Sequence, residues 1–423
     1  MIVLQEFVVE VEVGPSGIKR KSAIKETAVK STEIIQRNFM SLLTPEQKAI
    51  QQQAREFVAK HIIPFAAEYD KSCEFHPYLL EAAKEGKIFS MSIPKEFGGL
   101  AYDPLTQALV LEEWGYGCGG MGTTLAVTML PINSILLAGT PEQKKMFFAP
   151  LVAGGVASFC LTEPGAGSDA GNGKTTAKKD GNEYVLNGTK CFITNGAYAD
   201  RYVVYALTDP SKGAKGLSGF IVKKGTPGLS VGTIDHKLGI SSSNTVELLF
   251  KDARIPAENL LGKEGDGMKL ALMTLDRARP AIAALSVGIA QRALDECVKH
   301  LHTKFPGKSQ PGQTLQFKLA DMKTEIEAAR QLLHHTMELL ANGIVSIESA
   351  ECKTFAADIA MKVTTQAVQL MGAYGYTSEI SKLMRDAKIM QIYEGTNQIQ
   401  RLVISRAVLA PAPAATATQK AGK

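Results

Sequence analysis

The spacing of apolar residues changes twice along this chain of 423 residues, and that change restricts the fold more than any other feature. In residues 42–151 apolar residues recur every three or four positions, which is the spacing of a helix face. In residues 157–263 the pattern becomes short β-rich runs separated by turn sequences. Helical spacing returns in residues 267–409. The chain is therefore predicted to be an α+β protein, mainly α, in the order helices, β domain, helices.

Capping and turn residues refine these boundaries. Thr44, Pro45 and Gln47 form an N-cap, an N1 proline and a capping-box glutamine. Helices are expected at residues 78–88, 103–114, 122–137, 140–151, 281–302, 314–343 and 347–371. Strands are expected at residues 183–186, 191–194, 202–207, 219–222, 229–233 and 246–250, with turns at 180–182, 187–188 and 226–228. The predicted domains are a poorly ordered extension (1–41), a helical domain (42–156), an antiparallel β-barrel or sandwich (157–264), a helical bundle (265–409) and a disordered tail (410–423).

Composition excludes several classes of function. The net charge of +5 is small and scattered, which argues against nucleic acid as the main partner and suits an anionic small ligand. The six cysteines show no CxxC spacing, which indicates a reducing compartment, and the histidines lack partners at ligand spacing, so no metal site is expected. No run is apolar and long enough to span a bilayer, and the N-terminus lacks the basic start of a signal peptide.

A single carboxylate, Glu394, lies where the helical run over residues 382–392 ends. Gly395 relieves the backbone there, and Thr396 can cap a new helix with apolar positions at Ile399 and Leu402. Such a turn suits a base whose pKa is raised by exclusion of water. Taken alone, however, a glutamate in a turn is more often an exposed residue with no catalytic role.

Four further segments carry two interpretations each. Residues 159–169 form a glycine-rich loop that is neither a Walker A loop nor GxGxxG, and it is either a structural turn or a binding loop. Phe192, before a turn, is either a core residue or a platform for a flat cofactor ring. Asp276 and Arg279 form either a simple i,i+3 salt bridge or a ligand contact. The glycines in residues 369–376 are either a helix C-cap or a place where a ligand approaches the backbone.

Taken together and in this order, five segments closely resemble the acyl-CoA dehydrogenase family. The sequence as a whole resembles its short- and medium-chain members most. They are CLTEPGAGSD (160–169), FITNG (192–196), LDRARP (275–280), QLMGAYGY (369–376) and MRDAKIMQIYEGTNQIQR (384–401). The resemblance covers residues 42–409. It implies a helical N-terminal domain, a central β domain and a C-terminal four-helix bundle, assembled as a homotetramer with FAD between the last two.

The resemblance also implies a role for individual residues. Contacts to FAD are expected from Phe159, Thr162, Gly167, Ser168, Phe192, Ile193, Thr194, Thr396 and Gln398. Contacts to FAD across a dimer interface are expected from Gln313, Gln369, Leu370, Gly372 and Ala373. The acyl-CoA path is expected to involve Ser168, Asp276, Arg279, Tyr393, Gly395 and Arg406.

Glu394 matches the catalytic base of the family. The implied reaction is an α,β-desaturation of an acyl-CoA, in which Glu394 removes the α-proton while the β-hydrogen leaves as hydride to the flavin. Electrons would then pass to electron-transfer flavoprotein. Some members carry the base at the position of Ala278, which cannot act as one. The family further implies a cytoplasmic protein of a prokaryote, with the mitochondrial matrix as the alternative.

Two departures from the family affect these expectations. Relatives for dicarboxylyl substrates carry an Arg where residues 115–124 have no basic residue, so a straight or modest acyl chain is expected. Residues 302–308 lack an Arg that reaches the partner's FAD in many relatives, and Lys304 offers only a point charge there.

The pocket floor is predicted among Leu109, Val110, Leu125 and Leu130. The alternatives are an enoyl-CoA reductase running in reverse and a non-catalytic acyl-CoA-binding scaffold.

Overall fold

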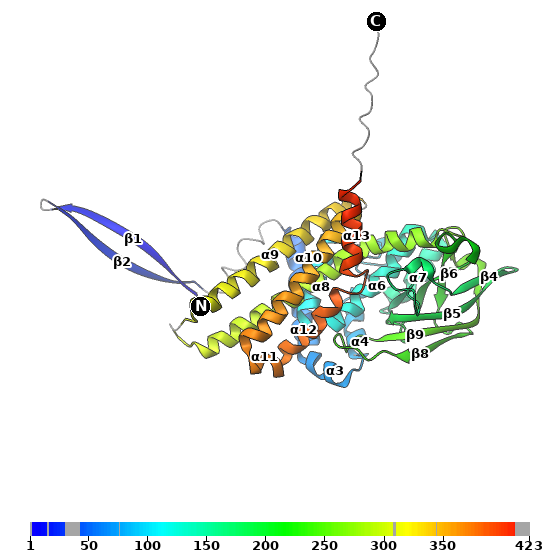
Figure 1. Ribbon diagram of the computed structural model, residues 1–423, viewed down its shortest axis with the longest axis horizontal. Coiled ribbons are helices and arrows are strands. Elements are labelled where there is room, and N and C mark those ends of the chain that lie inside the picture. The colour runs from blue at the N-terminus through cyan, green and yellow to red at the C-terminus, as the bar shows by residue number, and fades with distance from the viewer. Residues whose placement is uncertain are drawn as a thin grey trace, which may run out of the picture. The chain divides into compact units, whose positions relative to one another are not determined.

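The computed structural model describes residues 2–14, 17–29, 43–75, 77–307, 310–343 and 345–410 (Figure 1). The chain divides into two compact units, Met1–Gln52 and Gln53–Lys423. The expectations for residues 30–41 and for the tail from residue 411 onward lie outside the described residues.

The first unit contains a β-hairpin that sequence reasoning missed. Strands β1 (Ile2–Gly14) and β2 (Gly17–Val29) pair antiparallel over their whole length. The register places three glutamates opposite three lysines: Glu6 opposite Lys25, Glu10 opposite Lys21 and Glu12 opposite Lys19. Valine alternates with glutamate in β1, a two-residue period that favours a strand, and opposite charges at facing positions favour the pairing. Two strands are therefore assigned within residues 1–41, the segment predicted to be a poorly ordered extension.

Helix α2 begins at the predicted cap. Thr44 and Gln47 exchange backbone-to-side-chain hydrogen bonds of 3.0 and 3.1 Å at the start of α2, which confirms the predicted capping box. Thr140 and Gln143 make a second capping box at the start of α7. The helices are α2 (Pro45–His61), α3 (Ala66–Ser72), α4 (Pro77–Glu85), α5 (Pro104–Gly117), α6 (Gly119–Ala138) and α7 (Pro141–Val152).

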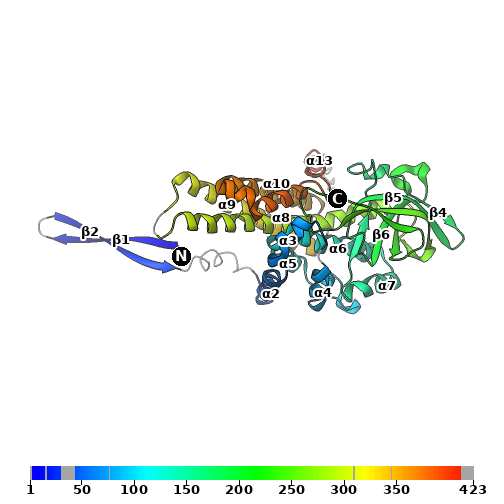
Figure 2. The same cartoon turned by 90° about the horizontal axis from the view of Figure 1, so that it is seen from below.

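Helix α6 is long and apolar enough to cross a membrane by length and composition. The expectation that no run reaches that length was wrong. However, 78% of its apolar window is buried inside the protein. A helix that is apolar on all sides is also what the core of a large soluble domain requires. Figure 2 shows α6 running between the helices and the β sheet.

The β domain is an eight-stranded sheet in the order β10-β7-β6-β4-β5-β9-β8, with β3 also paired to β6. Most pairs are antiparallel, whereas β3 and β4 both pair with β6 in parallel. The strands are β3 (Ala157–Cys160), β4 (Thr176–Asp180), β5 (Glu183–Thr194), β6 (Arg201–Leu207), β7 (Leu217–Lys223), β8 (Leu229–Ile234), β9 (Thr245–Pro256) and β10 (Leu260–Leu261).

The expected turn at residues 187–188 was wrong, because β5 continues through it with a shift of register. Gly188 has a φ of +149°, and a Cβ there would lie 2.5 Å from Thr175 Oγ1. The glycine is therefore needed for close packing against Thr175, which directly precedes strand β4, and not for a hairpin turn.

Alternate residues of the sheet face two apolar cores. Val204 of β6 lies in a cluster formed by the sheet itself, together with Phe220 and Leu248. Its neighbours Val203 and Tyr205 lie in a second cluster, with Phe147 and Phe148 of α7. The two-residue period of the strands thus separates an interior face from a face covered by helices.

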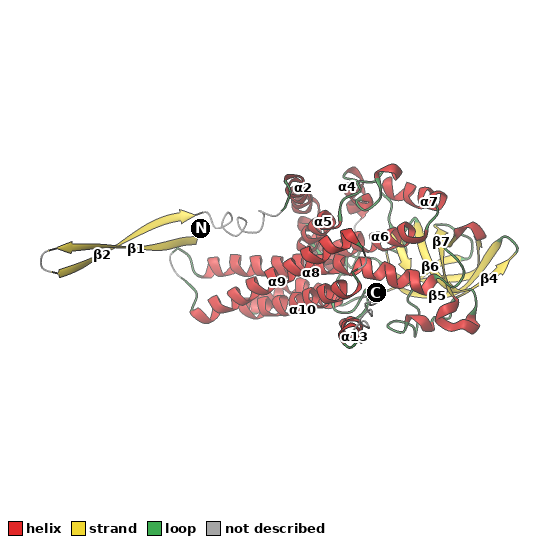
Figure 3. Ribbon diagram, turned by 90° about the horizontal axis from the view of Figure 1, so that it is seen from above, coloured by secondary structure: helices red, strands yellow, loops and turns green. Residues whose placement is uncertain are grey.

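The C-terminal part is a helical bundle that extends away from the sheet (Figure 3). Its helices are α8 (Gly267–Lys304), α9 (Gln313–Asn342), α10 (Ser346–Met371), α11 (Ala373–Thr377), α12 (Glu379–Met390) and α13 (Asn397–Val408). Helix α8 begins well before the expected residue 281 and contains Pro280 in its interior. An interior proline costs about 3 kcal/mol. Burial of Leu270 and Ala271 in the second apolar cluster opposes that cost.

Candidate active site

Glu394 lies in a tight turn between α12 and α13. Its φ is +55°, an uncommon backbone conformation for a residue with a side chain, and the next residue, Gly395, has a φ of +84°. The Thr396 hydroxyl accepts a hydrogen bond of 3.2 Å from Ile399 N, which confirms the predicted cap. Gln400 Nε2 donates to the carbonyl oxygens of Glu394 and Gly395 at 3.2 and 2.9 Å. The turn is therefore held in one strained shape by its own flanking residues.

The carboxylate of Glu394 is placed where its charge is costly. Burial raises its pKa to about 7, although the positive charges of Lys353 and Arg279 act in the opposite direction. Its Oε2 atom is buried and has no hydrogen-bond partner among the described residues. A buried acceptor without a partner is what a base needs to receive a proton from a bound molecule.

Two buried cations influence this carboxylate. Lys353 of α10 is 0% exposed, and its Nζ donates to Gly395 O and to Asn397 Oδ1, both at 2.9 Å. Burial lowers the pKa of Lys353 to about 7, against the favourable charge of Glu394. Arg279 of α8 is 3% exposed and pairs with Asp276 at 2.5 Å. The simple i,i+3 salt bridge weighed for Asp276 and Arg279 is therefore present, and it lies within the electrostatic reach of the base.

Phe192 is not a core residue. Its side chain is 67% exposed and its φ is +56°, at a second shift of register in β5. The next residue, Ile193, is buried in the sheet core, and the carbonyl oxygen of Thr194 accepts a 2.8 Å hydrogen bond from Ser158 Oγ. A strained bulge thus turns an aromatic ring outward while its neighbours stay fixed, which favours the platform interpretation.

A buried ion pair between Glu163 and Lys190 anchors the glycine-rich loop of residues 159–169 to strand β5. Lys190 Nζ lies 2.6 Å from Glu163 Oε1, and it also donates to Leu161 O at 3.1 Å. Cys191 N donates to Thr162 O at 3.0 Å, which ties the loop to β5. The far part of the loop is open: Gly167 and Ser168 are exposed, and a Cβ on Gly167 would meet no described atom within 4 Å.

Helix α6 brings these parts together. Thr123 Oγ1 lies 3.2 Å from the Tyr393 hydroxyl, beside the base. Asn195, at the end of the Phe192 segment, donates from Nδ2 to Thr124 O at 3.1 Å and to Thr128 Oγ1 at 3.2 Å. At 1.5 Å per residue, Thr123 and Thr128 are about 7.5 Å apart along the helix axis. The base turn and the Phe192 bulge therefore contact the same short stretch of one helix.

A small apolar cluster follows on the same helix. Val127 and Leu130 of α6 pack with Ala278 of α8, and Phe159 and Leu275 lie against them. Phe159 is also tilted against Tyr205, with ring centroids 5.1 Å apart. Of the residues expected at the pocket floor, all four are buried, and Leu130 belongs to this cluster: Leu109, Val110, Leu125 and Leu130.

A second group of predicted residues lies elsewhere. Gln369 follows Lys353 by 16 residues on α10, or about 24 Å along the axis at 1.5 Å per residue. His300 of α8 stacks on Tyr374 of α11, with centroids 4.9 Å apart, so the α8–α9 connection and the α10–α11 connection share one end of the bundle. Within one chain, the structure does not bring the residues expected to contact FAD across a dimer interface close to Glu394. These residues are Gln313, Gln369, Leu370, Gly372 and Ala373.

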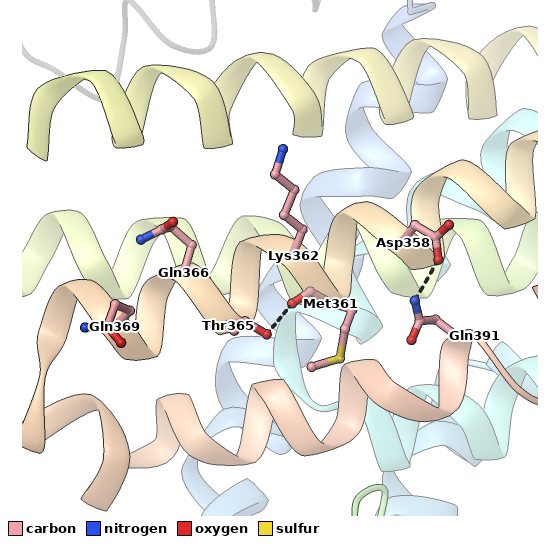
Figure 4. A pocket seen from close by; sticks show the side chains of 7 residues that line it. All are labelled: Asp358, Met361, Lys362, Thr365, Gln366, Gln369 and Gln391. Carbon is pink, nitrogen blue, oxygen red and sulfur yellow. Dashed lines mark hydrogen bonds between the residues drawn. The ribbon is translucent and has the colours of Figure 1, made fainter. Parts of the chain in front are cut away.

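A groove of about 510 Å³ lies along α10 on the way to that end (Figure 4). Its lining is mostly polar: Asp358, Met361, Lys362, Thr365, Gln366, Gln369 and Gln391. Asp358 Oδ1 accepts a 2.6 Å hydrogen bond from Gln391 Nε2 at the wall of the groove nearest the base turn. Of the remaining expected contacts, Gln398 and Arg406 are exposed on α13.

Sequence reasoning missed the buried polar residues that hold the base turn, chiefly Lys353, Asn397 and Gln400. One signal was available for Lys353. It occupies a position in the helix stripe that otherwise holds small, buried residues, namely Ala350, Ala357, Ala360 and Thr364. A lysine in such a stripe is seldom fully buried without a partner.

A helical domain, a mixed sheet and a helical bundle that place a buried carboxylate and an exposed aromatic side chain along one helix are the arrangement expected of a flavoprotein dehydrogenase. Three family models match: acyl-CoA dehydrogenase N-terminal domain over residues 44–155, middle domain over 158–253 and C-terminal domain over 265–409. The chain belongs to the acyl-CoA dehydrogenase family. It is an oxidoreductase, and FAD is its cofactor.

Relatives of known description agree with this placement. The chain is 43% identical over 372 residues to a short-chain-specific acyl-CoA dehydrogenase of Clostridium acetobutylicum, covering 86% of this chain and 98% of that one. It is 43% identical over 375 residues to acryloyl-CoA reductase (NADH) of Anaerotignum propionicum, covering 87% and 95%.

Two solved structures are also similar. One is butyryl-CoA dehydrogenase from Megasphaera elsdenii, with a TM-score of 0.83 and 41% identity over 87% of this chain and 99% of that one. The other comes from work on the electron transferring flavoprotein of Acidaminococcus fermentans, with a TM-score of 0.85 and 44% identity over 87% and 99%.

Proposed function

We propose that this protein desaturates a short acyl-CoA between its α and β carbons, with Glu394 as the base that removes the α-proton. The observation that carries the proposal is the state of that carboxylate: it lies on a strained turn, its pKa is raised to about 7 by burial, and its Oε2 atom has no partner among the described residues. A carboxylate of ordinary pKa would be too weak a base for a carbon acid.

The residues present fit FAD. Phe192 offers an outward aromatic face, and the open Gly167–Ser168 part of the loop leaves room for a ligand against backbone N–H groups. Thr162, Ile193 and Thr194 complete the expected contacts of this chain, together with Thr396 and Gln398 beyond the base. Bound FAD supplies the two-electron acceptor for the β-hydrogen.

The chain's own residues prepare the proton transfer. The backbone of the Glu394 turn is held by hydrogen bonds from Gln400 and Lys353 to its carbonyl oxygens, while Thr396 caps the helix that follows. Tyr393, hydrogen-bonded to Thr123, covers one side of the turn and limits the entry of water. The nearby charge of Arg279, itself held by Asp276, favours the ionised form of Glu394 and therefore keeps part of the base active at neutral pH.

We infer that a complete FAD site needs two copies of the chain. Gln313 and the residues around Gln369 are expected to contact the cofactor, yet Gln369 lies about 24 Å from Lys353 along α10. A second copy can bring that end of its bundle to the first copy's flavin segments. This supports a homo-oligomer, and the homotetramer implied by the resemblance belongs to the same proposal.

A short acyl chain is supported by the tight apolar cluster around Leu130, Ala278 and Phe159, and by the short-chain-specific and butyryl-CoA relatives. Electron-transfer flavoprotein is the proposed electron acceptor, because a similar chain was solved in work on that protein. The cytoplasm is the proposed location, in line with the bacterial relatives. An enoyl-CoA reductase running the reverse reaction is the second candidate, favoured by the similarity to acryloyl-CoA reductase.

Anaerobic flavin bleaching tests the proposal. The purified holoprotein is mixed with butyryl-, octanoyl- and palmitoyl-CoA, and bleaching is expected to be fastest with butyryl-CoA. Glu394→Gln should abolish bleaching while FAD stays bound, and Glu351→Gln, which alters an exposed glutamate of α10, serves as the matched control. Normal bleaching in Glu394→Gln would show that another group is the base. Faster reoxidation of the reduced protein by a short enoyl-CoA than reduction by butyryl-CoA would favour the reductase.

A further inference from the structure

Lys353 is a buried charge that the reaction as described does not use. It comes from the middle of α10, and its side chain is 0% exposed. Burying an ammonium group costs several kcal/mol unless its charge is well compensated. Apolar side chains of similar volume at such sites are often neutral or stabilising. A lysine at this position therefore calls for a role beyond stability.

Both hydrogen bonds of Lys353 go to residues that closely follow Glu394. Its Nζ donates to the carbonyl oxygen of Gly395, the residue directly after the base, and to Asn397 Oδ1 at the start of α13. Asn397 is itself held, because its Nδ2 donates to Asp358 Oδ1 at 2.8 Å. Asp358 Oδ1 also accepts from Gln391 Nε2, three residues before the base. Helix α10 therefore contacts the turn on both sides of Glu394, through Asp358 before it and through Lys353 after it.

The charge of Lys353 acts on the same group. Both of its hydrogen-bond acceptors are neutral oxygens, so the carboxylate that stabilises the ammonium most is that of Glu394. The other charged and titratable groups around the base are Arg279 and Asp276 on α8, Tyr393 in the turn itself, and Asp358 on α10, which also favours the charged form of Lys353. Arg279 is already paired with Asp276, whereas Lys353 has no such close carboxylate partner in the described part of the chain.

We propose that Lys353 is a positioning residue for the base: its two hydrogen bonds fix the Glu394 turn, and its charge favours the ionised form of the Glu394 carboxylate. The proposal rests on the proposed role of Glu394. The two parts of this role are separable, because the hydrogen bonds act on the backbone and the charge acts on the side chain.

Substitution of Lys353 is expected to shift the pH dependence of flavin reduction in one direction. A positive neighbour favours the ionised form of a carboxyl group, so its removal raises the pKa of Glu394. In Lys353→Met, the acid limb of the pH profile for flavin reduction should therefore move to higher pH, by about one unit or more. A merely structural lysine would lower the rate equally at all pH values. Lys318→Met, which removes an exposed lysine of α9, is the control and should leave the limb in place.

Asn397→Ala separates the two parts. It removes one acceptor of Lys353 but leaves the charge, so the acid limb should stay where it is in the unsubstituted protein. Amide hydrogen exchange in a peptide spanning residues 391–400, followed by mass spectrometry, should become faster in both Asn397→Ala and Lys353→Met. This readout needs no turnover and is made on the holoprotein with its FAD content measured.

The outcomes decide between the alternatives. An unmoved acid limb in FAD-loaded Lys353→Met, together with unchanged exchange over residues 391–400, overturns the proposal. Should Lys353→Met not fold, Lys353→Gln and Asn397→Ala take its place, and unchanged exchange in Asn397→Ala is then sufficient to reject the role of the hydrogen bonds. If the unsubstituted protein shows no bleaching with any acyl-CoA, the proposed function fails, while the exchange data still decide whether Lys353 holds the turn.

Discussion

Replacing Gly395 by alanine would put a methyl group into the narrowest part of the turn that carries Glu394. Gly395 has a φ of +84°, and a Cβ there would lie 2.6 Å from Gln400 Nε2. That atom would have to move, and with it the hydrogen bonds to the carbonyl oxygens of Glu394 and Gly395. At about 1 kcal/mol for each bond, the loss is about 2 kcal/mol, and the left-handed backbone adds about 1 kcal/mol of strain.

The control for this substitution is Gly225→Ala. Gly225 has a φ of +77°, but a Cβ there would meet no described atom within 4 Å, so only the strain is expected. Strain should cost both variants about 1 kcal/mol of unfolding free energy, and Gly395→Ala should lose about 2 kcal/mol more through the two hydrogen bonds, measured by urea denaturation of the holoprotein. Gly395→Ala should in addition slow anaerobic flavin reduction, by about 30-fold if the 2 kcal/mol is lost in the transition state. Equal reduction rates in the two variants would refute the view that Gln400 and Gly395 hold the base in place.

Four other predictions concern the segments expected to contact FAD or to support those contacts. Lys190→Met should cost about 3–5 kcal/mol of unfolding free energy, because it leaves the buried Glu163 carboxylate without its cation; a loss below 1 kcal/mol in urea denaturation would contradict this. Burial raises the pKa of Glu163, but Lys190 and the backbone N–H groups outweigh it and hold the pKa below its usual value. The contribution of Glu163 to the unfolding free energy should therefore be constant above about pH 5 and be lost as the pH drops through that lowered pKa. Phe192→Ala should weaken FAD binding by about threefold to tenfold while leaving stability nearly unchanged, since the ring is exposed; an unchanged FAD dissociation constant would remove Phe192 from the site. Lys304→Ala should ease FAD loss on dilution, and equal loss from both proteins would exclude a role for that lysine.

Local features of this protein could be predicted from sequence because their causes are local. The capping residues Thr44, Gln47 and Thr396 act within one helical turn, and all three make the expected hydrogen bonds. The order of helices, β domain and helices follows from the period of apolar residues, which depends only on the geometry of each element. The role proposed for Glu394 came from resemblance, since on its own it is a glutamate in a turn.

Other features depend on contacts between distant residues, and only the tertiary structure decided them. Phe192 is exposed because a bulge turns its ring away from the sheet core, and the bulge exists only in the pairing of β5 with β9. Helix α8 continues through Pro280 because burial of its first turns opposes the cost of the proline. Lys353 meets the Glu394 turn across more than 40 residues of sequence. Sequence spacing does not reveal such contacts, because they form only when separate elements pack into one low-dielectric interior. In that interior the pKa of Glu394 rises to about 7.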